Sequence, residues 1–313
     1  MSIYYGDDAI TYLAKKAHQQ DPKSSSHWDF YHSDFRFDNG KFSGVGGFGG
    51  VEREYTGLKK IVHYAYQTPF RRMAKKFPNF NAINELAKDI LSKDRQDKGY
   101  NLDVLRQVIS LAYLEEKKAV KEKGMSCVIG DGFATMTSLL LEYSNQRVVL
   151  VNLVKTLLMD LWKLKMLLKF EFNNQVAVVT SESDMLKVLA ETDGKSFTIV
   201  VEAENHELMQ LCPIDLTINI ASMQEMNPEV VSEYFTNISI AAKNNSSLFY
   251  CCNREYKVLF DGTVVDFEKY PWSMANKILD DELCPWHLKY YSTKPPFYHD
   301  YDGPIRHRLA QFS

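Results

Sequence analysis

From residue 125 onward, short runs of apolar and β-branched residues alternate with longer segments of helical periodicity. Short runs of this kind, bounded by glycine, asparagine and serine, are typical of buried strands. The strand candidates are 126–129, 147–151, 175–180, 197–201, 214–220 and 247–252. Strands that alternate with helices form βαβ units. The sequence therefore predicts a Rossmann-like α/β fold, with a doubly wound, mostly parallel sheet between two layers of helices.

The end of the chain departs from this alternation. Segments 287–291 and 305–312 are strand-like and have no helical segment between them. Two such runs in succession pair most simply as antiparallel strands. We therefore expect a C-terminal antiparallel hairpin at the edge of the sheet.

The first hundred residues contain almost no strand-like runs. Helical patterns cover 4–20, 54–76 and 80–93, and six glycines fall between Gly40 and Gly50. The sequence predicts a helical N-terminal region, 1–100, and a Rossmann-like domain, 101–313. We expect the N-terminal region to cover an acceptor or to support assembly into a homo-oligomer. Its glycine-rich loop is compatible with a lid over the site and with a loop of no special role.

Composition limits the partners and the location of the protein. The 313-residue chain has 25% charged residues and a formal net charge of −3, which gives no basic surface of the kind that binds nucleic acid. The five cysteines are odd in number and include the neighbours Cys251 and Cys252, which fits reduced thiols better than disulfides. Segment 151–170 is the most apolar helix candidate, and Asp160 and Lys163 interrupt it. We expect a cytoplasmic protein without a secretion signal, a membrane span or a nucleic-acid partner.

The segment after the first strand candidate indicates a ligand site. Gly130, Asp131, Gly132 and Phe133 stand between that strand and the next helix. Gly130 permits a tight turn and Gly132 lets a ligand approach the backbone, while free N–H groups at the helix start face the ligand. The spacing is G-x-G-x-A, with Ala134 last, so the dinucleotide fingerprint G-x-G-x-x-G is not met. A purely structural turn is the alternative interpretation.

The second strand candidate is followed by Asn152. Rossmann-like folds usually place a carboxylate here to bind the ribose hydroxyls of the ligand. An asparagine side chain can donate and accept the same hydrogen bonds. It also suits the N-cap of the next helix, and the two roles are compatible.

Several motifs along the chain resemble those of the sugar O-methyltransferase family. They are VIGDGF at 128–133, VNL at 151–153, LLMDL at 157–161, IDLTINIASMQEM at 214–226, YCCNRE at 250–255, YPW at 270–272, CPW at 284–286 and HRLA at 307–310. The resemblance covers most of the chain from about residue 125, and 219–226 is its most distinctive part. It implies a class I methyltransferase fold, S-adenosylmethionine as the methyl donor, and a hydroxyl of a sugar or glycan-related small molecule as the acceptor.

We expect the cofactor to bind across the glycine turn, the end of the second strand candidate and the polar end of the fifth. The predicted contacts are Gly130, Asp131, Gly132, Phe133, Asn152, Asn219 and Ser222. The chain departs from the general methyltransferase pattern at Val128, where many enzymes have an acid, and at Ala134, which replaces a third glycine. Asp131 is then expected to make the polar contact with the methionine end of the cofactor.

Methyl transfer to a hydroxyl requires alignment of donor and acceptor and removal of a proton. Glu225, in the loop after the fifth strand candidate, is the first candidate for the base. An acid that stabilises the first turn of a helix fits the same position. His206, after the fourth strand candidate, is the second candidate, because an unperturbed histidine has a pKa near about 6.5. A solvent-exposed histidine at a helix start is its alternative.

No metal site is expected from the sequence. Cys284 and His287 have C-x-x-H spacing, and Cys251 and Cys252 could add thiolates, but a structural zinc site needs four ligands in paired spacing. The acidic run 280–282 fits a solvated turn.

Two other functions stay open at this point. One is a non-catalytic protein that still binds S-adenosylmethionine, which Val128 and Asn152 allow. The other is a nicotinamide-dependent oxidoreductase, and the missing third glycine and the C-terminal hairpin speak against it.

Overall fold

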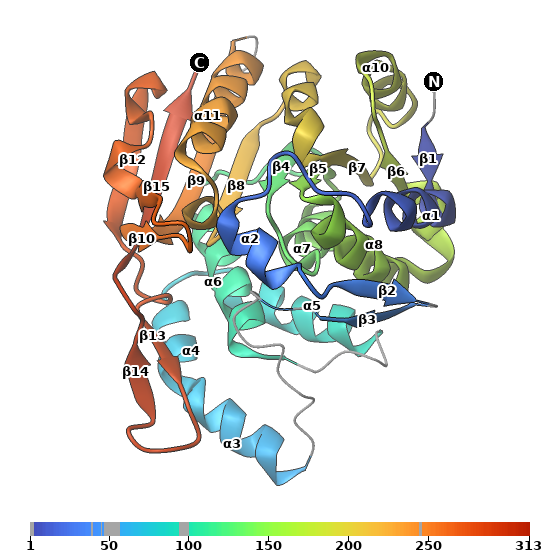
Figure 1. The fold of residues 1–313 in the computed structure, drawn as a ribbon. Coiled ribbons are helices and arrows are strands. Elements are labelled where there is room, and N and C mark those ends of the chain that lie inside the picture. The colour runs from blue at the N-terminus through green and yellow to red at the C-terminus, as the bar shows by residue number, and fades with distance from the viewer. Residues whose placement is uncertain (1–2, 39, 45, 47–56, 94–99, 244–245) are drawn as a thin grey trace.

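The structure is a computed structural model that describes residues 3–38, 40–44, 46, 57–93, 100–243 and 246–313 (Figure 1). Within these residues a nine-stranded sheet has the order β1-β6-β7-β5-β4-β8-β9-β15-β12. Its strands are β1 (Tyr4–Tyr5), β4 (Met125–Ile129), β5 (Arg147–Asn152), β6 (Val176–Val178), β7 (Phe197–Glu202), β8 (Leu216–Ile220), β9 (Ser247–Arg254), β12 (Lys277–Leu283) and β15 (Ile305–Phe312). The strands from β4 to β9 pair in parallel, which confirms the Rossmann-like α/β fold.

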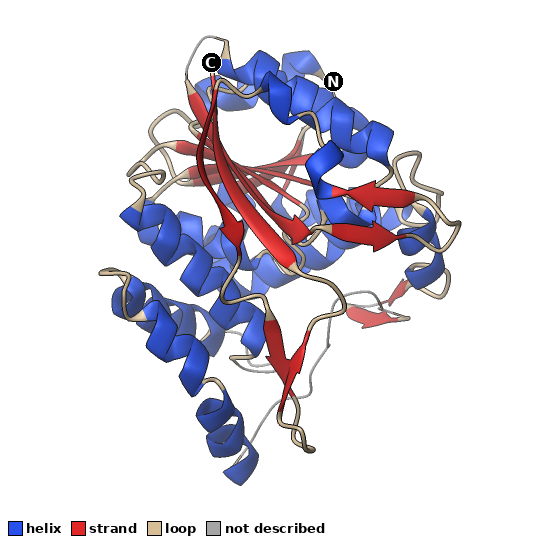
Figure 2. Ribbon diagram, turned by 90° about the vertical axis from the view of Figure 1, so that its left-hand side faces the viewer, coloured by secondary structure: helices blue, strands red, loops and turns tan. Residues whose placement is uncertain are grey.

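Helices cover both faces of the sheet (Figure 2). They are α1 (Gly6–Lys16), α2 (Ser26–Tyr31), α3 (Leu58–Tyr66), α4 (Thr68–Ala74), α5 (Phe80–Ser92), α6 (Leu102–Glu116), α7 (Thr135–Ser144), α8 (Val154–Leu168), α9 (Phe172–Gln175), α10 (Glu182–Glu191) and α11 (Pro228–Ala242), with the short 3₁₀ turns η1 (Lys169–Glu171), η2 (Ala203–Leu211), η3 (Met223–Glu225), η4 (Phe267–Lys269) and η5 (Trp272–Met274). Successive strand residues face opposite layers. Val128 packs with α5 to α8, whereas Cys127 and Ile129 pack with α10 and α11.

The N-terminal helices share a hydrophobic core with the sheet. Leu13 of α1 and Ile83 of α5 are fully buried in the same cluster as Val128. Tyr4 and Tyr5 pair antiparallel with β6, so the chain begins at a sheet edge. The division of the chain at residue 100 stays a prediction, and part of the glycine-rich loop (45 and 47–50) lies outside the described residues.

The C-terminal strand is antiparallel, as expected, but its position and partner differ from the prediction. β15 lies inside the sheet, antiparallel to β9 on one side and to β12 on the other. The expected partner, 287–291, contains β13 (Lys289–Tyr291), which pairs with β14 (Tyr298–Asp300) in a separate hairpin. The true partner β12 includes the acidic run 280–282, which the sequence predicted as a turn. β12 is an edge strand, where exposed charged side chains are favourable because they prevent further pairing.

Two further hairpins stand outside the main sheet. They are β2–β3 (Arg36–Asp38 and Lys41–Ser43) and β10–β11 (Tyr256–Val258 and Val264–Asp266). Within the described residues, every helix is too short or too polar to cross a bilayer.

We expect the packing of β15 to depend more on Arg308 than on its neighbour Arg306. The Arg308 side chain is 7% exposed and Nη2 donates to Asp281 Oδ2 at 2.7 Å, with the guanidinium 4.5 Å from the centre of the Trp272 ring. The Arg306 side chain is 25% exposed and also contacts Asp281. Buried hydrogen bonds to charged groups contribute about 1.5–3 kcal/mol and exposed ion pairs about 0–1 kcal/mol.

Arg308→Ala should therefore lower the free energy of unfolding by about 2 kcal/mol more than Arg306→Ala. Urea denaturation of both variants measures the difference. Equal losses would mean that β15 is not held in the buried position described here.

Candidate functional site

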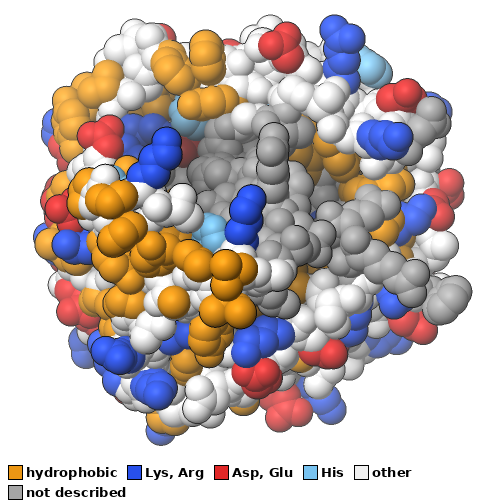
Figure 3. Space-filling view, turned by 90° about the horizontal axis from the view of Figure 1, so that it is seen from below, with side chains coloured by type: hydrophobic (Ala, Val, Ile, Leu, Met, Phe, Trp, Pro, Cys, Tyr) orange, Lys and Arg blue, Asp and Glu red, His pale blue; other side chains and the backbone are white. Residues whose placement is uncertain are grey.

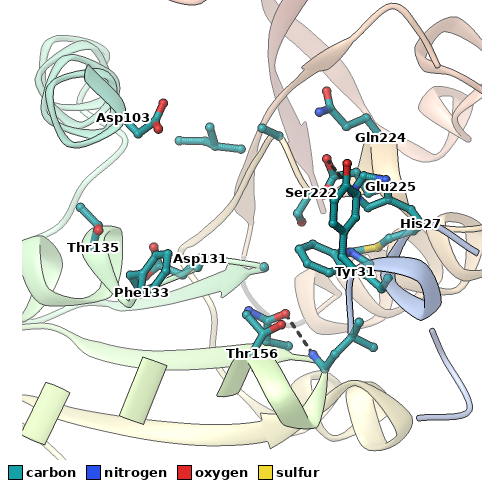
Figure 4. Close-up of a pocket in the computed structure, with 18 of the residues that line it drawn as sticks. His27, Tyr31, Asp103, Asp131, Phe133, Thr135, Thr156, Ser222, Gln224 and Glu225 are labelled. Atoms are coloured by element: carbon teal, nitrogen blue, oxygen red, sulfur yellow. Dashed lines mark hydrogen bonds and ion pairs between the residues drawn. The ribbon is translucent and has the colours of Figure 1, made fainter. Parts of the chain in front are cut away.

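The carboxyl ends of the parallel strands open into one cavity of about 1560 Å³ (Figure 4). Ligands of open α/β sheets bind at this edge. Figure 3 views the molecule from this side, where apolar side chains gather on one part of the face and basic side chains lie among them. Typical small-molecule pockets measure about 300–1,000 Å³. The cavity is therefore large enough for two small molecules side by side.

The first wall of the cavity is the turn after β4. Gly130 has φ +71°, and a Cβ there would overlap Ser222 Oγ, so only glycine fits. Ser222 Oγ donates to Ile129 O at 3.1 Å, and Asn219 Nδ2 donates to the same carbonyl at 2.9 Å. Asn219 and Ser222, which were predicted to contact the cofactor, thus stabilise the turn by donating hydrogen bonds to the backbone at the end of β4.

The rest of the turn is left-handed. Gly132, Phe133 and Ala134 have φ values of +63°, +64° and +49°. Left-handed backbone costs non-glycine residues about 1–2 kcal/mol each, and Asp160 of α8 offsets this cost by accepting from Ala134 N at 2.9 Å. The other oxygen of Asp160 accepts from Asn152 Nδ2 at 3.1 Å. A buried carboxyl that the sequence did not single out therefore joins the turn to the end of β5.

Asp131 lines the cavity and caps α7. Its two carboxylate oxygens accept from Met136 N at 2.9 Å and Thr137 N at 2.7 Å. Burial raises the pKa of Asp131, and the hydrogen bonds from Thr137 and Met136 oppose the shift. The carboxylate of Asp131 thus caps the start of α7. Two of the N–H groups that were expected to face a ligand donate to Asp131 instead.

The structure brings most of the predicted site residues together. The cavity is lined by Gly130, Asp131, Gly132, Phe133, Asn152, Ser222 and Glu225. Asn219 lies beneath the turn and does not reach the cavity wall.

His206 does not reach the cavity. Its Nε2 lies 2.9 Å from Glu233 Oε2, and its Nδ1 is bonded to the Asn237 side chain. The physical reason is that η2 runs back along α11, so the imidazole packs against that helix, beside the Tyr234 ring. The expectation that His206 faces an acceptor therefore needs correction.

Glu225 lies on the opposite wall from the glycine turn (Figure 4). Its Oε1 is 2.9 Å from Lys257 Nζ on β10 and 3.5 Å from His27 Nε2 on α2. Burial raises the pKa of Glu225, and the nearby Lys257 ammonium opposes this shift. The backbone of the loop is fixed, because Ser25 Oγ donates to Glu225 O at 2.5 Å.

His27 is a site residue that the sequence reasoning missed. Burial lowers the pKa of His27 to about 3, and the positive charge of Lys257 adds to the effect. The imidazole is therefore neutral, and its buried Nε2 has no hydrogen-bond partner. The ring centre lies 4.8 Å from that of Tyr31 and 5.8 Å from that of Phe260. Segment 21–53 has no hydrophobic periodicity, so nothing in the sequence pointed to this residue.

A small apolar cluster closes the cavity beyond the ends of β5 and β7. It consists of Trp28, Leu153 and Ala203, with Tyr31 packed against it. All four residues line the cavity. Such a surface suits a flat aromatic ligand group.

No protein-family model matches the chain, and no curated protein matches its sequence. Two solved structures illustrate the similarity that was found. Magnesium protoporphyrin IX methyltransferase from Synechocystis PCC 6803, with bound SAH, is 14% identical at a TM-score of 0.39, over 68% of this chain and 84% of that chain. A SAM-dependent methyltransferase from Leishmania major is 10% identical at a TM-score of 0.35, over 67% of this chain and 71% of that chain. Similarity this low supports no conclusion about function, which has to come from the site.

We expect Gly130→Ala to be more destabilising than its positive φ alone explains. Gly194 is the matched control, because its φ of +68° is close to the +71° of Gly130 and no atom lies within 4 Å of its added Cβ. Gly130→Ala should lower the free energy of unfolding by about 1–3 kcal/mol more than Gly194→Ala, owing to the overlap with Ser222. Thermal and urea unfolding measure both variants. A difference near zero would show that the turn does not pack on Ser222.

Proposed function

We propose that the protein is an S-adenosylmethionine-dependent methyltransferase that methylates a hydroxyl of a sugar-like small molecule. The observation that carries the proposal is one cavity with a glycine turn on one wall and the buried Glu225, Lys257 and His27 on the other (Figure 4). A glycine turn of this kind suits a nucleotide-like ligand, and a carboxylate on the facing wall could remove a proton from an acceptor. The antiparallel β15 supports it, because a mostly parallel sheet with an antiparallel last strand is usual for class I methyltransferases.

The glycine turn, Asn152 and the apolar cluster together fit the cofactor. The apolar cluster of Trp28, Leu153 and Ala203 would hold the adenine ring. Asn152 would bind the ribose: its Nδ2 donates one bond to Asp160 and its Oδ1 accepts one from Leu153 N at 3.0 Å, which leaves one donor and one acceptor position. When bound, the cofactor supplies a methyl group on a sulfonium leaving group.

The second wall fits an acceptor with several hydroxyl groups. Gln224, Arg254 and Lys257 line it together with the rings of Tyr31 and Phe260. Arg254 Nε is buried and lacks a hydrogen-bond partner. Polar groups beside aromatic faces suit a sugar ring, because its hydroxyls need hydrogen bonds and its C–H face packs on an aromatic ring.

Glu225 would accept the proton of the acceptor hydroxyl. The methyl group would come from the bound cofactor, and Glu225 would take the hydroxyl proton that the acceptor loses on methylation. The raised pKa of Glu225 favours this transfer, because a base is most effective when its pKa is near the working pH. Neutral His27 would orient the hydroxyl through its unpartnered Nε2.

Calorimetry with S-adenosylmethionine, S-adenosylhomocysteine and NAD tests the cofactor. Transfer of a labelled methyl group to a panel of sugars and nucleotide sugars tests the reaction. Binding together with transfer supports the proposal. Binding without transfer would favour the non-catalytic alternative, and binding of NAD alone would favour an oxidoreductase.

We expect Glu225→Gln to remove the base without removing the cofactor site. General-base catalysis typically contributes about a hundred- to ten-thousand-fold, so kcat should fall within that range. Glu229→Gln is the matched control, since Glu229 is exposed at the start of α11. A base acts when deprotonated, so wild-type kcat should rise with pH through a pKa above the ordinary 4.5 and then level off. A loss below about tenfold would mean that Glu225 is not the base.

His27 and His206 should behave differently when each is changed to glutamine. His27→Gln should lower kcat/KM by about tenfold or more, because the hydrogen bond between His27 and the methyl acceptor is lost. A loss of about 1.4 kcal/mol corresponds to a factor of ten. His206→Gln should leave kcat/KM near the wild-type value, because His206 lies outside the cavity. Steady-state kinetics with the methyl acceptor compare them. The reverse order would restore His206 as the residue that contacts the acceptor.

A further inference from the structure

Three buried side chains, one from β9 and two from the segment after β12, bring metal-binding atoms together. Cys252 belongs to β9, Cys284 follows β12 directly, and His287 comes three residues later. One potential ligand atom from each lies within 4.8 Å of the others, and all three residues are buried. The inserted strand β15 is responsible, because it pairs with β9 on one side and β12 on the other. Cys284 N donates to Ile305 O of β15 at 2.8 Å, which fixes the backbone of Cys284 against β15.

The imidazole of His287 is the second observation that points to a ligand. His287 is 6% exposed, and its Nε2 has no hydrogen-bond partner. Its neighbours are satisfied: Trp286 Nε1 donates to Ser110 Oγ at 2.9 Å, and the two nitrogens of His307 lie 3.2 Å from Tyr250 Oη and 3.3 Å from Glu282 Oε1. An unsatisfied buried polar atom costs about 1–3 kcal/mol. A bound ion is one of the few physical explanations for such an atom in a native structure.

We propose that Cys252, Cys284 and His287 bind a zinc ion whose fourth coordination position faces the cavity. Sulfur and imidazole ligands together select zinc over hard cations such as magnesium. Two thiolates and one divalent cation are neutral as a group, which makes burial of the charges feasible. Metal–ligand distances of about 2.0–2.3 Å place tetrahedral ligands about 3.5–3.8 Å apart. The three ligand atoms lie within 4.8 Å of one another, so binding requires them to approach by no more than about 1 Å.

The open position follows from the location of His287. Among the described residues, the group contains no fourth histidine, cysteine or acidic ligand. His287 itself lines the cavity that holds the glycine turn and Glu225. The fourth ligand is then a water molecule or an atom of a bound acceptor, and three protein ligands with one exchangeable position are typical of catalytic zinc. A zinc ion here would lower the pKa of a coordinated hydroxyl or thiol.

In the sequence, Cys284 and His287 together with Cys251 and Cys252 predict no metal site, because four ligands in paired spacing are lacking. The structure brings Cys252, and not Cys251, to the other two residues. The proposal does not depend on methyl transfer. If the protein binds zinc but transfers no methyl group, the zinc proposal is supported and only the proposed function is contradicted.

Metal analysis of the purified full-length chain tests the proposal. Zinc per chain is measured by mass spectrometry after purification with a reductant, and Co²⁺ titration reports thiolate ligation through its charge-transfer and visible bands. The variants are Cys252→Ser, Cys284→Ser and His287→Gln. Cys251→Ser is the matched control, because Cys251 is the chain neighbour of Cys252, is equally buried, and packs in the other core cluster.

We expect stoichiometric zinc in the wild type and in Cys251→Ser. Each of the three ligand variants should bind zinc at least about a hundredfold more weakly, since loss of an outer-shell partner alone costs about ten- to a hundredfold. Chelation should lower the Tm of the wild type and of Cys251→Ser only. His287→Gln keeps both thiols, so it reports on the site even if a serine variant does not fold.

Three results would overturn the proposal. One is a folded wild type, by circular dichroism, with neither stoichiometric zinc nor a thiolate–cobalt band. Another is equal loss of metal in Cys251→Ser and Cys252→Ser. The third is a disulfide between Cys252 and Cys284 in the native protein, detected by peptide mass analysis.

Discussion

The hydrogen bonds of one buried asparagine support both walls of the cavity. Asn219, in the central strand β8, donates to Ile129 O at 2.9 Å and so fixes the end of β4 where the glycine turn begins. Its Oδ1 accepts from Met223 N at 3.1 Å and from Asn253 Nδ2 at 2.8 Å. The first of these bonds shapes the loop that carries Glu225, and the second joins the end of β8 to β9. A leucine at this position would leave several buried groups unsatisfied, each at about 1–3 kcal/mol.

The sequence predicted the parts of the fold that obey a local rule. Buried parallel strands have to be apolar along their length, so the strands from β4 to β9 were visible as short apolar runs. The turn at Gly130 and Gly132 was visible because left-handed backbone next to a close contact requires glycine. Glu225 was visible because it follows the strand that contributes to the ligand-binding edge.

The missed parts depend on partners far away in the chain. β12 carries Asp280 and Asp281 because it is an edge strand whose charges pair with Tyr113 of α6, Lys117 and Arg308. His27 comes from an irregular segment, and only the packing of α2 over the cavity makes it a site residue. Distant pairing leaves no periodic signal in the sequence, so these features needed three-dimensional structure.

Burial shifts the pKa values of His27 and Glu225 in opposite directions, and both residues lie close to Lys257. Lys257 Nζ lies 2.9 Å from Glu225 Oε1, and its charge also helps to keep the pKa of His27 low. A proton on His27 would add a second cation beside Lys257 in a buried space, which is costly. A proton on Glu225 removes a buried negative charge, which burial favours. The same burial thus weakens the imidazole as a base and strengthens the carboxylate, and this difference supports the proposed roles of Glu225 as proton acceptor and His27 as hydrogen-bonding partner.

Helices that precede β4 in the chain contribute side chains to the cavity. α2 supplies His27 and Trp28, and α6 supplies Arg106, which is 3% exposed. Arg106 donates through Nε to Trp286 O at 3.1 Å and through Nη2 to Lys289 O at 2.7 Å, so a helix before β4 fixes the segment that carries His287. Because a buried guanidinium without partners is very unfavourable, α6 and this C-terminal segment are expected to fold and unfold together. The cavity therefore joins the two ends of the chain, and its shape depends on both.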